Sequence, residues 1–321
     1  MTIINKICFA AASFICLLTL MGAGCAGNAG GVKPPEKPVI EVESNKDQMW
    51  KDLVKQVDFG PRVPGTQAHL NTRDWIIASL VPNCDSVKTQ QFSHVLGGKN
   101  ITMWNVIANI NGKGAESRDK VLLAAHWDTR PKADQDLNIA KQQTPIDGAN
   151  DGASGVAILL EIARMVKNHP IDRDVELVFF DGEDYGPGIN NMLLGSAYYA
   201  KNIVLKPNWG ILLDMVGDAD LTVYREPNSE KLAKFVNDKI FRAALSAGYI
   251  RTGTKPGFID QLYKYPIIDD HIAINDAGVP MVDLIDFDYP YWHTTGDTIN
   301  KCSADSLKVM ADTVYLTISK Q

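Results

Sequence analysis

The order of apolar and polar positions divides the chain into three regions of different texture. Residues 7–21 form a run of mainly apolar residues, whereas residues 26–44 are rich in Gly, Pro, Asn and Glu and show no apolar period. Such a composition cannot bury enough surface to order itself, so residues 25–44 are predicted to form a flexible tether. Amphipathic patterns begin after it, and residues 45–321 are predicted to fold as a single domain.

Within this domain, apolar spacing predicts a series of alternating strands and helices. From residue 120 onward the strands are continuously apolar, which is typical of a parallel sheet covered by helices on both faces. The first two strands are joined by a short connection, for which antiparallel pairing is the simplest arrangement. The predicted fold class is therefore α/β with a mixed, mostly parallel central sheet. The expected helices are 47–57, 66–80, 152–168, 193–201, 229–247 and 303–319, and the expected strands are 87–92, 101–110, 121–125, 175–180, 209–213 and 279–285.

Two segments interrupt this alternation. Residues 127–147 form a long polar stretch directly after a strand, and residues 248–270 form an insert rich in Gly, Pro and Tyr. Long loops within compact domains are usually functional, so both are expected to lie near a binding site.

The N-terminal apolar run has the layout of a secretory signal. Lys6 precedes it, and the run is too short and wrongly flanked for a membrane span, so residues 1–24 are predicted to be removed on export. Small residues lead to Cys25, as in the cleavage box of bacterial lipoproteins, although Gly22 stands where that box usually has Leu. The prediction is a periplasmic or cell-envelope lipoprotein that contacts the membrane only through this anchor, with simple secretion as the alternative.

The composition of the chain restricts the kinds of molecule that it is expected to bind. The 321 residues are 45% hydrophobic and 22% charged, enough for one substantial core, and the formal net charge of −6 becomes −7 when Lys6 is lost with the signal. This acidic balance argues against nucleic acid as a partner. Of five cysteines only Cys84 and Cys302 belong to the folded region, so at most one disulfide is expected.

Candidate chemistry gathers where the predicted strands end. The strand 175–180 is followed by Asp181, Glu183 and Asp184 around a glycine. Ligands of open α/β sheets bind at the carboxyl ends of strands, although a solvated acidic turn is the commoner origin of such a run. Other strands end similarly, in His126, Asp214 and His293, and Asp151 opens a helix between the first two.

The segment 147–155 that contains Asp151 is made largely of small residues, which would let the backbone approach a bound cation. An Asx turn capping the next helix is the alternative explanation of its Asp and Asn residues. Taken with the strand ends, the histidines and carboxylates form a donor set that suits Zn²⁺.

These residues also carry a family resemblance. Five blocks in order and spacing resemble the zinc-dependent aminopeptidase superfamily: His126-Trp-Asp, Gly148-Ala-Asn-Asp-Gly-Ala-Ser-Gly155, Phe179-Phe-Asp-Gly-Glu-Asp184, Leu212-Leu-Asp214 and Trp292-His293. Within it, Phe59-Gly-Pro-Arg-Val-Pro-Gly65, Asp269-Asp-His271 and the Trp before His293 resemble the glutaminyl cyclase branch, especially its bacterial members.

The resemblance implies a role for each matching position. Three residues would bind zinc: Asp151, Asp184 and His293. Glu183 would be the general acid/base, Asp214 and Asp269 a carboxylate pair near the scissile amide, and Trp292 a wall of the substrate pocket. In the aminopeptidase branch, His126 and Asp214 instead hold a second zinc with Asp151 bridging, and this sequence keeps both residues.

Three functions follow from the resemblance. A cyclase closes N-terminal Gln of a peptide or protein by intramolecular attack, which can be worth about 7–11 kcal/mol, so one zinc suffices and His126 would lie behind it, braced by Asp128. An aminopeptidase makes a nucleophile from water, for which two metals are well suited. The third alternative is a non-catalytic peptide-binding surface lipoprotein. For Asp269, capping a short helix at 271–276 is the alternative to a catalytic role.

Overall fold

The computed structural model describes residues 40–96, 98–113 and 119–320. The predicted signal 1–24, the candidate lipid site Cys25 and the tether as far as residue 39 lie outside the described residues. The helices are α1 (Lys46–Asp58), α2 (Gln67–Leu80), α3 (Ala153–Asn168), α4 (Leu194–Lys201), α5 (Pro227–Ala247), α6 (Asp270–Asp276) and α7 (Ala304–Ser319). The strands are β1 (Ser86–Leu96), β2 (Lys99–Ile110), β3 (Lys120–His126), β4 (Asp174–Phe180), β5 (Trp209–Asp214), β6 (Thr222–Arg225), β7 (Gly257–Leu262) and β8 (Met281–Ile285).

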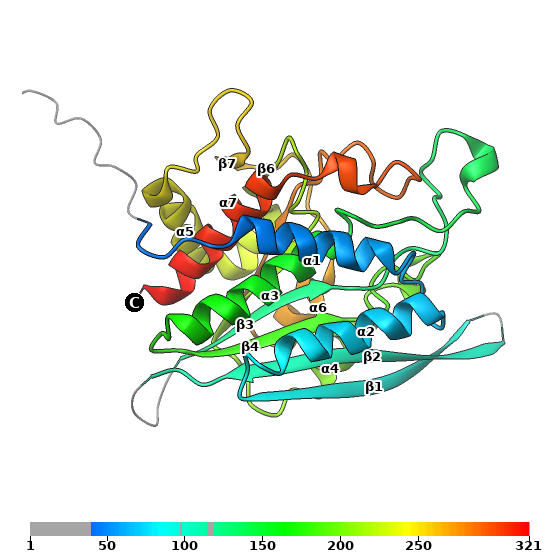
Figure 1. Cartoon of the computed structure of the whole chain (residues 1–321), viewed down its shortest axis with the longest axis horizontal. Coiled ribbons are helices and arrows are strands. Elements are labelled where there is room, and N and C mark those ends of the chain that lie inside the picture. Colours follow the sequence, from blue (N-terminus) through cyan, green and yellow to red (C-terminus); the bar gives the residue numbers. More distant parts are fainter. Residues whose placement is uncertain (1–39, 97, 114–118, 321) are drawn as a thin grey trace, which may run out of the picture. The chain divides into compact units, whose positions relative to one another are not determined.

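The central sheet has six strands in the order β1-β2-β4-β3-β5-β8 (Figure 1). β4, β3, β5 and β8 run parallel to their neighbours in this set, whereas β1 and β2 pair antiparallel with each other and β2 pairs antiparallel with β4. This confirms the predicted mixed, mostly parallel sheet. The pair β6-β7 was not predicted, because β6 is only four residues long and β7 lies inside the insert 248–270, which is rich in Gly, Pro and Tyr.

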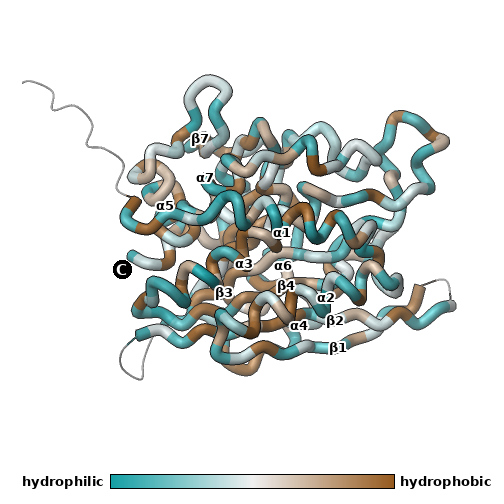
Figure 2. Tube along the Cα trace, in the orientation of Figure 1, coloured by the Kyte–Doolittle hydropathy of each residue, from teal (hydrophilic) through white to brown (hydrophobic). Residues whose placement is uncertain are grey.

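Helices cover both faces of the sheet, as the continuously apolar strands predict. One face packs against α3, with α7 and α1 beyond it, and alternate residues of β3 (Val121, Leu123, Ala125) belong to that core. The other residues of β3, Leu122 and Ala124, pack on the opposite face with residues of α4 and α6. Hydrophobic, brown segments are accordingly frequent around β3, β4 and α3 (Figure 2).

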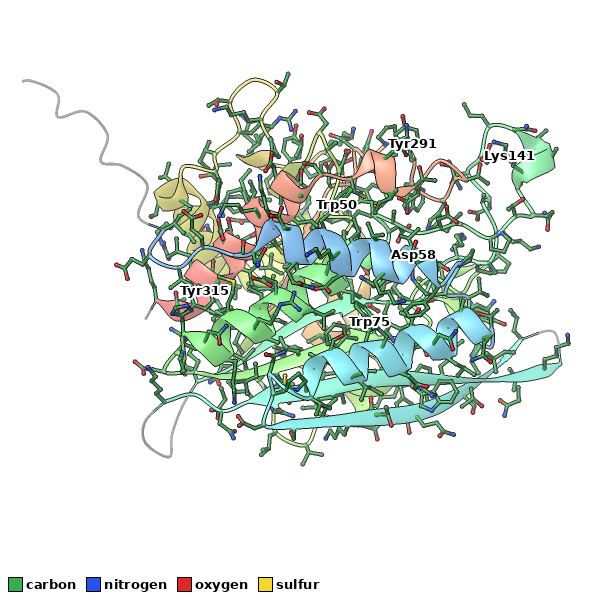
Figure 3. All side chains as sticks on the ribbon, in the orientation of Figure 1. Trp50, Asp58, Trp75, Lys141, Tyr291 and Tyr315 are labelled. Carbon is green, nitrogen blue, oxygen red and sulfur yellow. The ribbon has the colours of Figure 1, made fainter. Side chains whose placement is uncertain are left out.

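The two N-terminal helices differ in what they cover. α2 packs on β2, as expected for a helix on the outside of the sheet. α1 was also expected on the sheet but packs on α3 and α7, because α3 already occupies that face. Trp50 of α1 and Trp75 of α2 (Figure 3) are partly buried against this core.

Close packing of α3 places its N-terminus against the strand ends. A Cβ on Gly155 would clash with the carbonyl oxygen of Leu213 and would lie 2.8 Å from the Ala125 Cβ. Glycine at this position therefore lets the first turn of α3 approach the carboxyl ends of β3 and β5, where the candidate residues lie.

In the described part of the chain, Cys84 and Cys302 are both free thiols, and none of the helices is long and apolar enough to span a membrane.

Candidate active site

Three of the predicted ligands converge at the carboxyl end of the sheet. Asp151 precedes α3, Asp184 follows β4, and His293 lies in the loop after β8. The His293 Nε2 atom is 3.1 Å from Asp184 Oδ1 and 3.7 Å from Asp151 Oδ2. One ligand atom from each residue lies within 4.8 Å of the others, and all three side chains are buried. We call this set the first triad.

A second triad shares Asp151 with the first. His126 Nε2 lies 3.1 Å from Asp151 Oδ1 and 3.1 Å from Asp214 Oδ1, and these three side chains are also buried. Asp151 therefore stands between two groups that could each hold a cation.

The donor atoms fit a metal ion. Asp151 Oδ2 and Asp184 Oδ2 are buried and have no hydrogen-bond partner among the described residues, although buried polar atoms are normally paired. Imidazole and carboxylate donors suit Zn²⁺, and three protein ligands leave a position for substrate. The structure thus brings together every residue that the sequence nominated as a ligand.

Glycine and a strained residue permit this convergence. Gly152 has φ of 96°, and a Cβ there would lie 2.9 Å from the Asp128 carbonyl oxygen and 3.0 Å from His126 Cε1. His293 has φ of 54°, a left-handed conformation that costs free energy in any residue but glycine. Such strain persists where the surrounding structure imposes it, often at functional sites.

Two further carboxylates fix the backbone that carries the ligands. Asp128 accepts hydrogen bonds from the backbone N–H groups of Glu183 (3.0 Å) and Asp184 (3.2 Å). Asp297 does the same for the N–H groups of Asn150 (2.9 Å) and Asp151 (3.1 Å). Asp128 Oδ1 also lies 3.6 Å from His126 Nδ1, an ion-pair distance, and the expected bracing of His126 by Asp128 stays a prediction.

Burial and like charge determine the protonation of the site. Burial, followed by the charge of Asp184, raises the pKa of Glu183 well above its usual range. Burial lowers the pKa of His293, but the carboxylates of Asp184 and Asp134 outweigh burial and raise this pKa to about 9. These carboxylates therefore favour positive charge at this position, which a divalent cation would supply.

A pocket of about 330 Å³ opens beside the first triad. Four carboxylates line it, those of Asp151, Glu183, Asp214 and Asp269, and the remaining wall is mostly apolar, formed by Met192, Ile267, Ile268, Phe287 and Trp292. The Trp292 ring stacks on His293 with centroids 3.9 Å apart. The insert 248–270 thus lines the pocket through its last residues, and Trp292 lies where a pocket wall was predicted.

Asp269 occupies a position that is compatible with both predictions made for it, a helix cap and a carboxylate of the active site. Its Oδ1 accepts a hydrogen bond from the Asp270 N–H at the start of α6, while its buried Oδ2 has no partner among the described residues. Burial and the neighbouring Asp214 raise the pKa of Asp269 to about 7. A single carboxylate therefore caps a helix and faces the pocket.

Asp181, the first of the three acids after β4, turns away from this site. Its carboxylate oxygens lie 2.9 Å from His69 Nε2, and one of them accepts a 2.6 Å hydrogen bond from the Trp104 N–H. His69 stacks on Trp127 with centroids 4.3 Å apart. Asp181 and His69 therefore form a buried structural pair, and only Glu183 and Asp184 serve the site.

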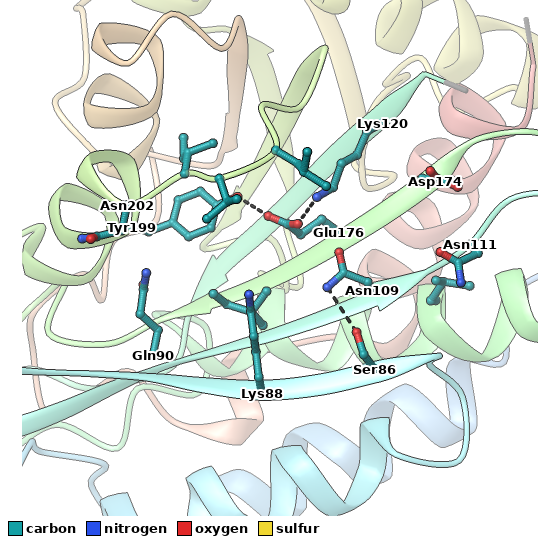
Figure 4. A pocket seen from close by; sticks show the side chains of 15 residues that line it. Ser86, Lys88, Gln90, Asn109, Asn111, Lys120, Asp174, Glu176, Tyr199 and Asn202 are labelled. Atoms are coloured by element: carbon teal, nitrogen blue, oxygen red, sulfur yellow. Dashed lines mark hydrogen bonds and ion pairs between the residues drawn. The ribbon is translucent and has the colours of Figure 1, made fainter. Parts of the chain in front are cut away.

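A larger pocket, of about 440 Å³, lies at the opposite end of the sheet (Figure 4). It is lined by Lys120 at the start of β3, Asp174 and Glu176 at the start of β4, and Tyr199 of α4. Glu176 already accepts hydrogen bonds from Lys120 and Tyr199. The charge of Glu176 is thus neutralised within the chain. None of the residues that line this pocket belongs to either triad.

Comparison with known proteins agrees with this geometry. The sequence profile of peptidase family M28 matches residues 105–318. The chain belongs to peptidase family M28. The M28 chain resembles the solved structure of a Zn-dependent exopeptidase from Parabacteroides distasonis, with 32% identity and a TM-score of 0.81 over 88% of this chain and 100% of that one. The family and this neighbour indicate zinc as the metal and an enzyme of the zinc exopeptidase type.

Two further relatives differ in their named activities. The solved glutaminyl cyclase of Bacteroides thetaiotaomicron, bound to N-acetylhistamine, is 35% identical with a TM-score of 0.80, over 87% of this chain and 99% of that one. Aminopeptidase YwaD of Bacillus subtilis is 26% identical over 232 residues, 68% of this chain. The M28 chain spans only 45% of the length of that aminopeptidase.

Sequence reasoning missed several residues of the site. Arg130 and Asp134 contact first-triad residues from within the long loop 127–147, and Asp297 supports Asp151 from a loop near the C-terminus. Arg62 belongs to the segment 59–65, which resembles the glutaminyl cyclase branch, but the sequence suggested no role for it. Arg62 is fully buried and donates hydrogen bonds to the carbonyl oxygens of Trp127 (3.2 Å) and Gly148 (2.6 Å), joining two ligand-bearing segments.

Proposed function

We propose that this chain is a zinc-dependent glutaminyl-peptide cyclotransferase that converts N-terminal Gln of exported peptides or proteins to pyroglutamate with release of ammonia. The observation that carries the proposal is the pocket, in which Glu183, Asp269 and Trp292 surround the approach to the first triad. Similarity to the glutaminyl cyclase of Bacteroides thetaiotaomicron supports it.

The proposed roles follow from the positions of the side chains. Asp151, Asp184 and His293 would hold zinc, which when bound polarises a carbonyl oxygen as a Lewis acid. Trp292 and the apolar wall would hold the Gln side chain and exclude water. The α-amine of the substrate is then positioned to attack its own γ-carboxamide, so activated water is not required.

Glu183 would transfer the proton in this reaction. As the bond forms between the α-nitrogen and the carbonyl carbon (Cδ) of the γ-carboxamide, Glu183 accepts a proton from the amine. It then donates that proton to the departing amide nitrogen, and the carbon–nitrogen bond breaks to release ammonia. A carboxylate whose pKa is raised by burial suits this double role, because an acid/base group works best near the ambient pH.

Asp214 and Asp269 would share a proton beside this reaction. Both line the pocket, and the pKa of Asp269, raised by burial and by Asp214, is the pattern expected of two close carboxylates that cannot both ionise. Such a pair offers one hydrogen-bond donor toward the attacking or departing nitrogen.

The second triad favours one alternative, a zinc aminopeptidase. If His126, Asp151 and Asp214 hold a second ion, two metals can generate the hydroxide that peptide hydrolysis needs. Similarity to aminopeptidase YwaD supports this alternative.

One experiment separates the two reactions. The zinc-loaded enzyme is incubated with two peptides that differ only in their first residue, Gln or Leu, and the products are weighed by mass spectrometry beside an enzyme-free control. We expect the Gln-first peptide to lose the mass of ammonia and the Leu-first peptide to stay intact. Release of free Leu with no cyclisation of the Gln-first peptide would establish the aminopeptidase instead.

A further inference from the structure

Arg130, in the long loop after β3, bridges two carboxylates at the first triad. Its Nε and Nη2 atoms donate to both oxygens of Asp134 at 2.9 and 2.7 Å, and its Nη1 donates to Asp184 Oδ1 at 2.7 Å. The Arg130 side chain is largely buried. A guanidinium has fixed donor directions, so these three bonds set the position of Asp184 relative to Asp134.

Asp134 extends the contact to a second ligand. Its Oδ1 lies 3.5 Å from His293 Nδ1, on the ring edge opposite the Nε2 atom that faces Asp184 and Asp151. The next residue, Gln135, donates its backbone N–H to the His293 carbonyl oxygen at 3.1 Å. The loop therefore holds the ring and the backbone of His293 together.

The chain also leaves room for the arginine. Gly186, two residues after Asp184, has φ of 31°, and a Cβ there would lie 2.8 Å from Arg130 Nη1. Any larger residue would push the guanidinium away from Asp184.

We propose that Arg130 and Asp134 are positioning residues that hold Asp184 and His293 for the metal and make the first triad the tighter of the two cation sites. Arg130 takes Asp184 Oδ1, which leaves Oδ2, a buried oxygen without a hydrogen-bond partner among the described residues, for the ion. Asp134 orients the His293 ring from its far edge, as supporting carboxylates do for metal-ligating histidines. The inference rests on the zinc site of the proposed function and not on which reaction follows.

The second triad lacks a comparable arginine. In the described part of the chain, the ion pairs of Asp151 and Asp214 involve only histidines, whereas Arg130 fixes Asp184 in the first triad. The two histidines do not differ in this respect, because Asp128 lies 3.6 Å from His126 Nδ1 and Asp134 lies 3.5 Å from His293 Nδ1. A ligand that is not held in place beforehand must be ordered when the ion binds. This ordering costs free energy, so the affinity of the site for the ion is lower. The first triad should therefore fill first when zinc is added.

Zinc affinity of the full-length enzyme tests the proposal. Arg130→Gln removes the charge and the bridge, and we expect it to weaken zinc binding about 10–100-fold, the usual effect of losing a residue that supports a metal ligand. Arg130→Lys should restore part of the affinity, because an ammonium can reach one carboxylate but cannot bridge two. The measurement is competition with a zinc-chelating dye, accompanied by the melting temperature of the metal-free protein.

Arg173→Gln is the matched control. Arg173 is as buried as Arg130, at 7% exposed, but it donates to the carbonyl oxygens of Ile318 and Lys320 at the far end of the chain. We expect this variant to melt at a lower temperature and to bind zinc like the wild type. If Arg130→Gln binds zinc as tightly as Arg173→Gln does, the proposal is wrong.

Asp134→Asn keeps the test decisive if Arg130→Gln does not fold. It removes the charge behind His293 and leaves the bond from Arg130 to Asp184, so zinc affinity should fall by less than in Arg130→Gln. Unchanged affinity would contradict the proposal.

Titration of wild-type protein with zinc should also show a tightly bound first ion and a more weakly bound second ion, and equal affinities would contradict the proposal. A wild type that binds no zinc would instead refute the proposed function.

Discussion

Glu183 and Asp184 are adjacent in sequence but face different partners. Glu183 lines the pocket, with Oε2 3.8 Å from His126 Nδ1, whereas Asp184 contacts His293 and Arg130. Asp128 holds the backbone N–H groups of both, so neither residue can rotate to exchange roles without losing two hydrogen bonds. Substitutions at the two positions should therefore affect turnover and zinc content differently.

For Glu183→Gln we expect turnover to fall about 10²–10⁴-fold, because the amide keeps the shape of the side chain but cannot accept a proton. Zinc content should stay at the wild-type level, as measured by elemental analysis of the purified variant. Loss of zinc together with activity would show that Glu183 is a ligand.

For His126→Ala we expect the zinc content to stay at one ion per chain. His126 belongs only to the second triad, and the first triad keeps its three donors without it. Elemental analysis of wild type and variant, prepared with the same zinc supply, measures this. Two tightly held ions in the wild type, one of them lost in the variant, would favour the aminopeptidase.

At the scale of elements, the N-terminus of α5 anchors the wall of the pocket. Glu226 caps α5 by accepting hydrogen bonds from the N–H groups of Asn228 and Ser229, and it also accepts one from the Ile267 N–H at 2.9 Å. Burial raises the pKa of Glu226, but His271 and these N–H groups outweigh burial and lower the pKa to about 2. The insert is thus tied to the body of the domain next to Ile268 and Asp269.

Glu226→Gln should lower the free energy of unfolding by about 3 kcal/mol at neutral pH, since each pKa unit corresponds to about 1.4 kcal/mol. A folded-state pKa below the unfolded value of 4.5 stabilises the protein above pH 4.5, and this stabilisation is lost as pH falls toward 2. Denaturant unfolding of wild type and variant should therefore differ at pH 7 and converge at about pH 2 to 3. A difference that does not change with pH would show that the lost charge is not its cause. Asp305→Asn, at an exposed acid of α7, is the control.

At the scale of the whole molecule, the M28 domain follows a segment that is predicted from the sequence to direct export. The described residues begin at residue 40, and the sequence between Cys25 and that point has a low apolar content. We propose that the mature protein begins at Cys25 and is held at the cell envelope by a lipid on that residue, which would place the site where exported peptides pass.

Cys25→Ala should move the protein from the membrane fraction to the soluble fraction, because a lipid chain and not a protein segment would hold it. Fractionation of cells that produce wild type or variant, followed by detection of the protein, measures the change. Cys84→Ala serves as the control, since Cys84 lies within the folded domain. Wild-type protein that is already soluble and starts after residue 25 would exclude the anchor.

The sequence by itself determined the central elements and the types of ligand. Continuous apolar runs such as 121–125 and 175–180 can only be covered on both sides, so a helix-covered parallel sheet followed from pattern alone. Because the carboxyl ends of parallel strands meet at one edge, the residues that follow them, His126, Asp184 and Asp214 among them, were predictable neighbours.

Only the tertiary structure decided which of these residues work together and what supports them. Asp181 is chemically equivalent to Asp184 in the sequence, but it lies before the turn at Gly182 and contacts His69 and the Trp104 N–H, whereas Asp184 lies beyond that turn and contacts His293. Arg130, Asp134 and Asp297 lie in irregular loops, and their partners are brought close by folding. Apolar periodicity records which face of an element is buried, whereas a hydrogen bond between distant loops leaves no period in the sequence, so these contacts exist only once the chain has folded.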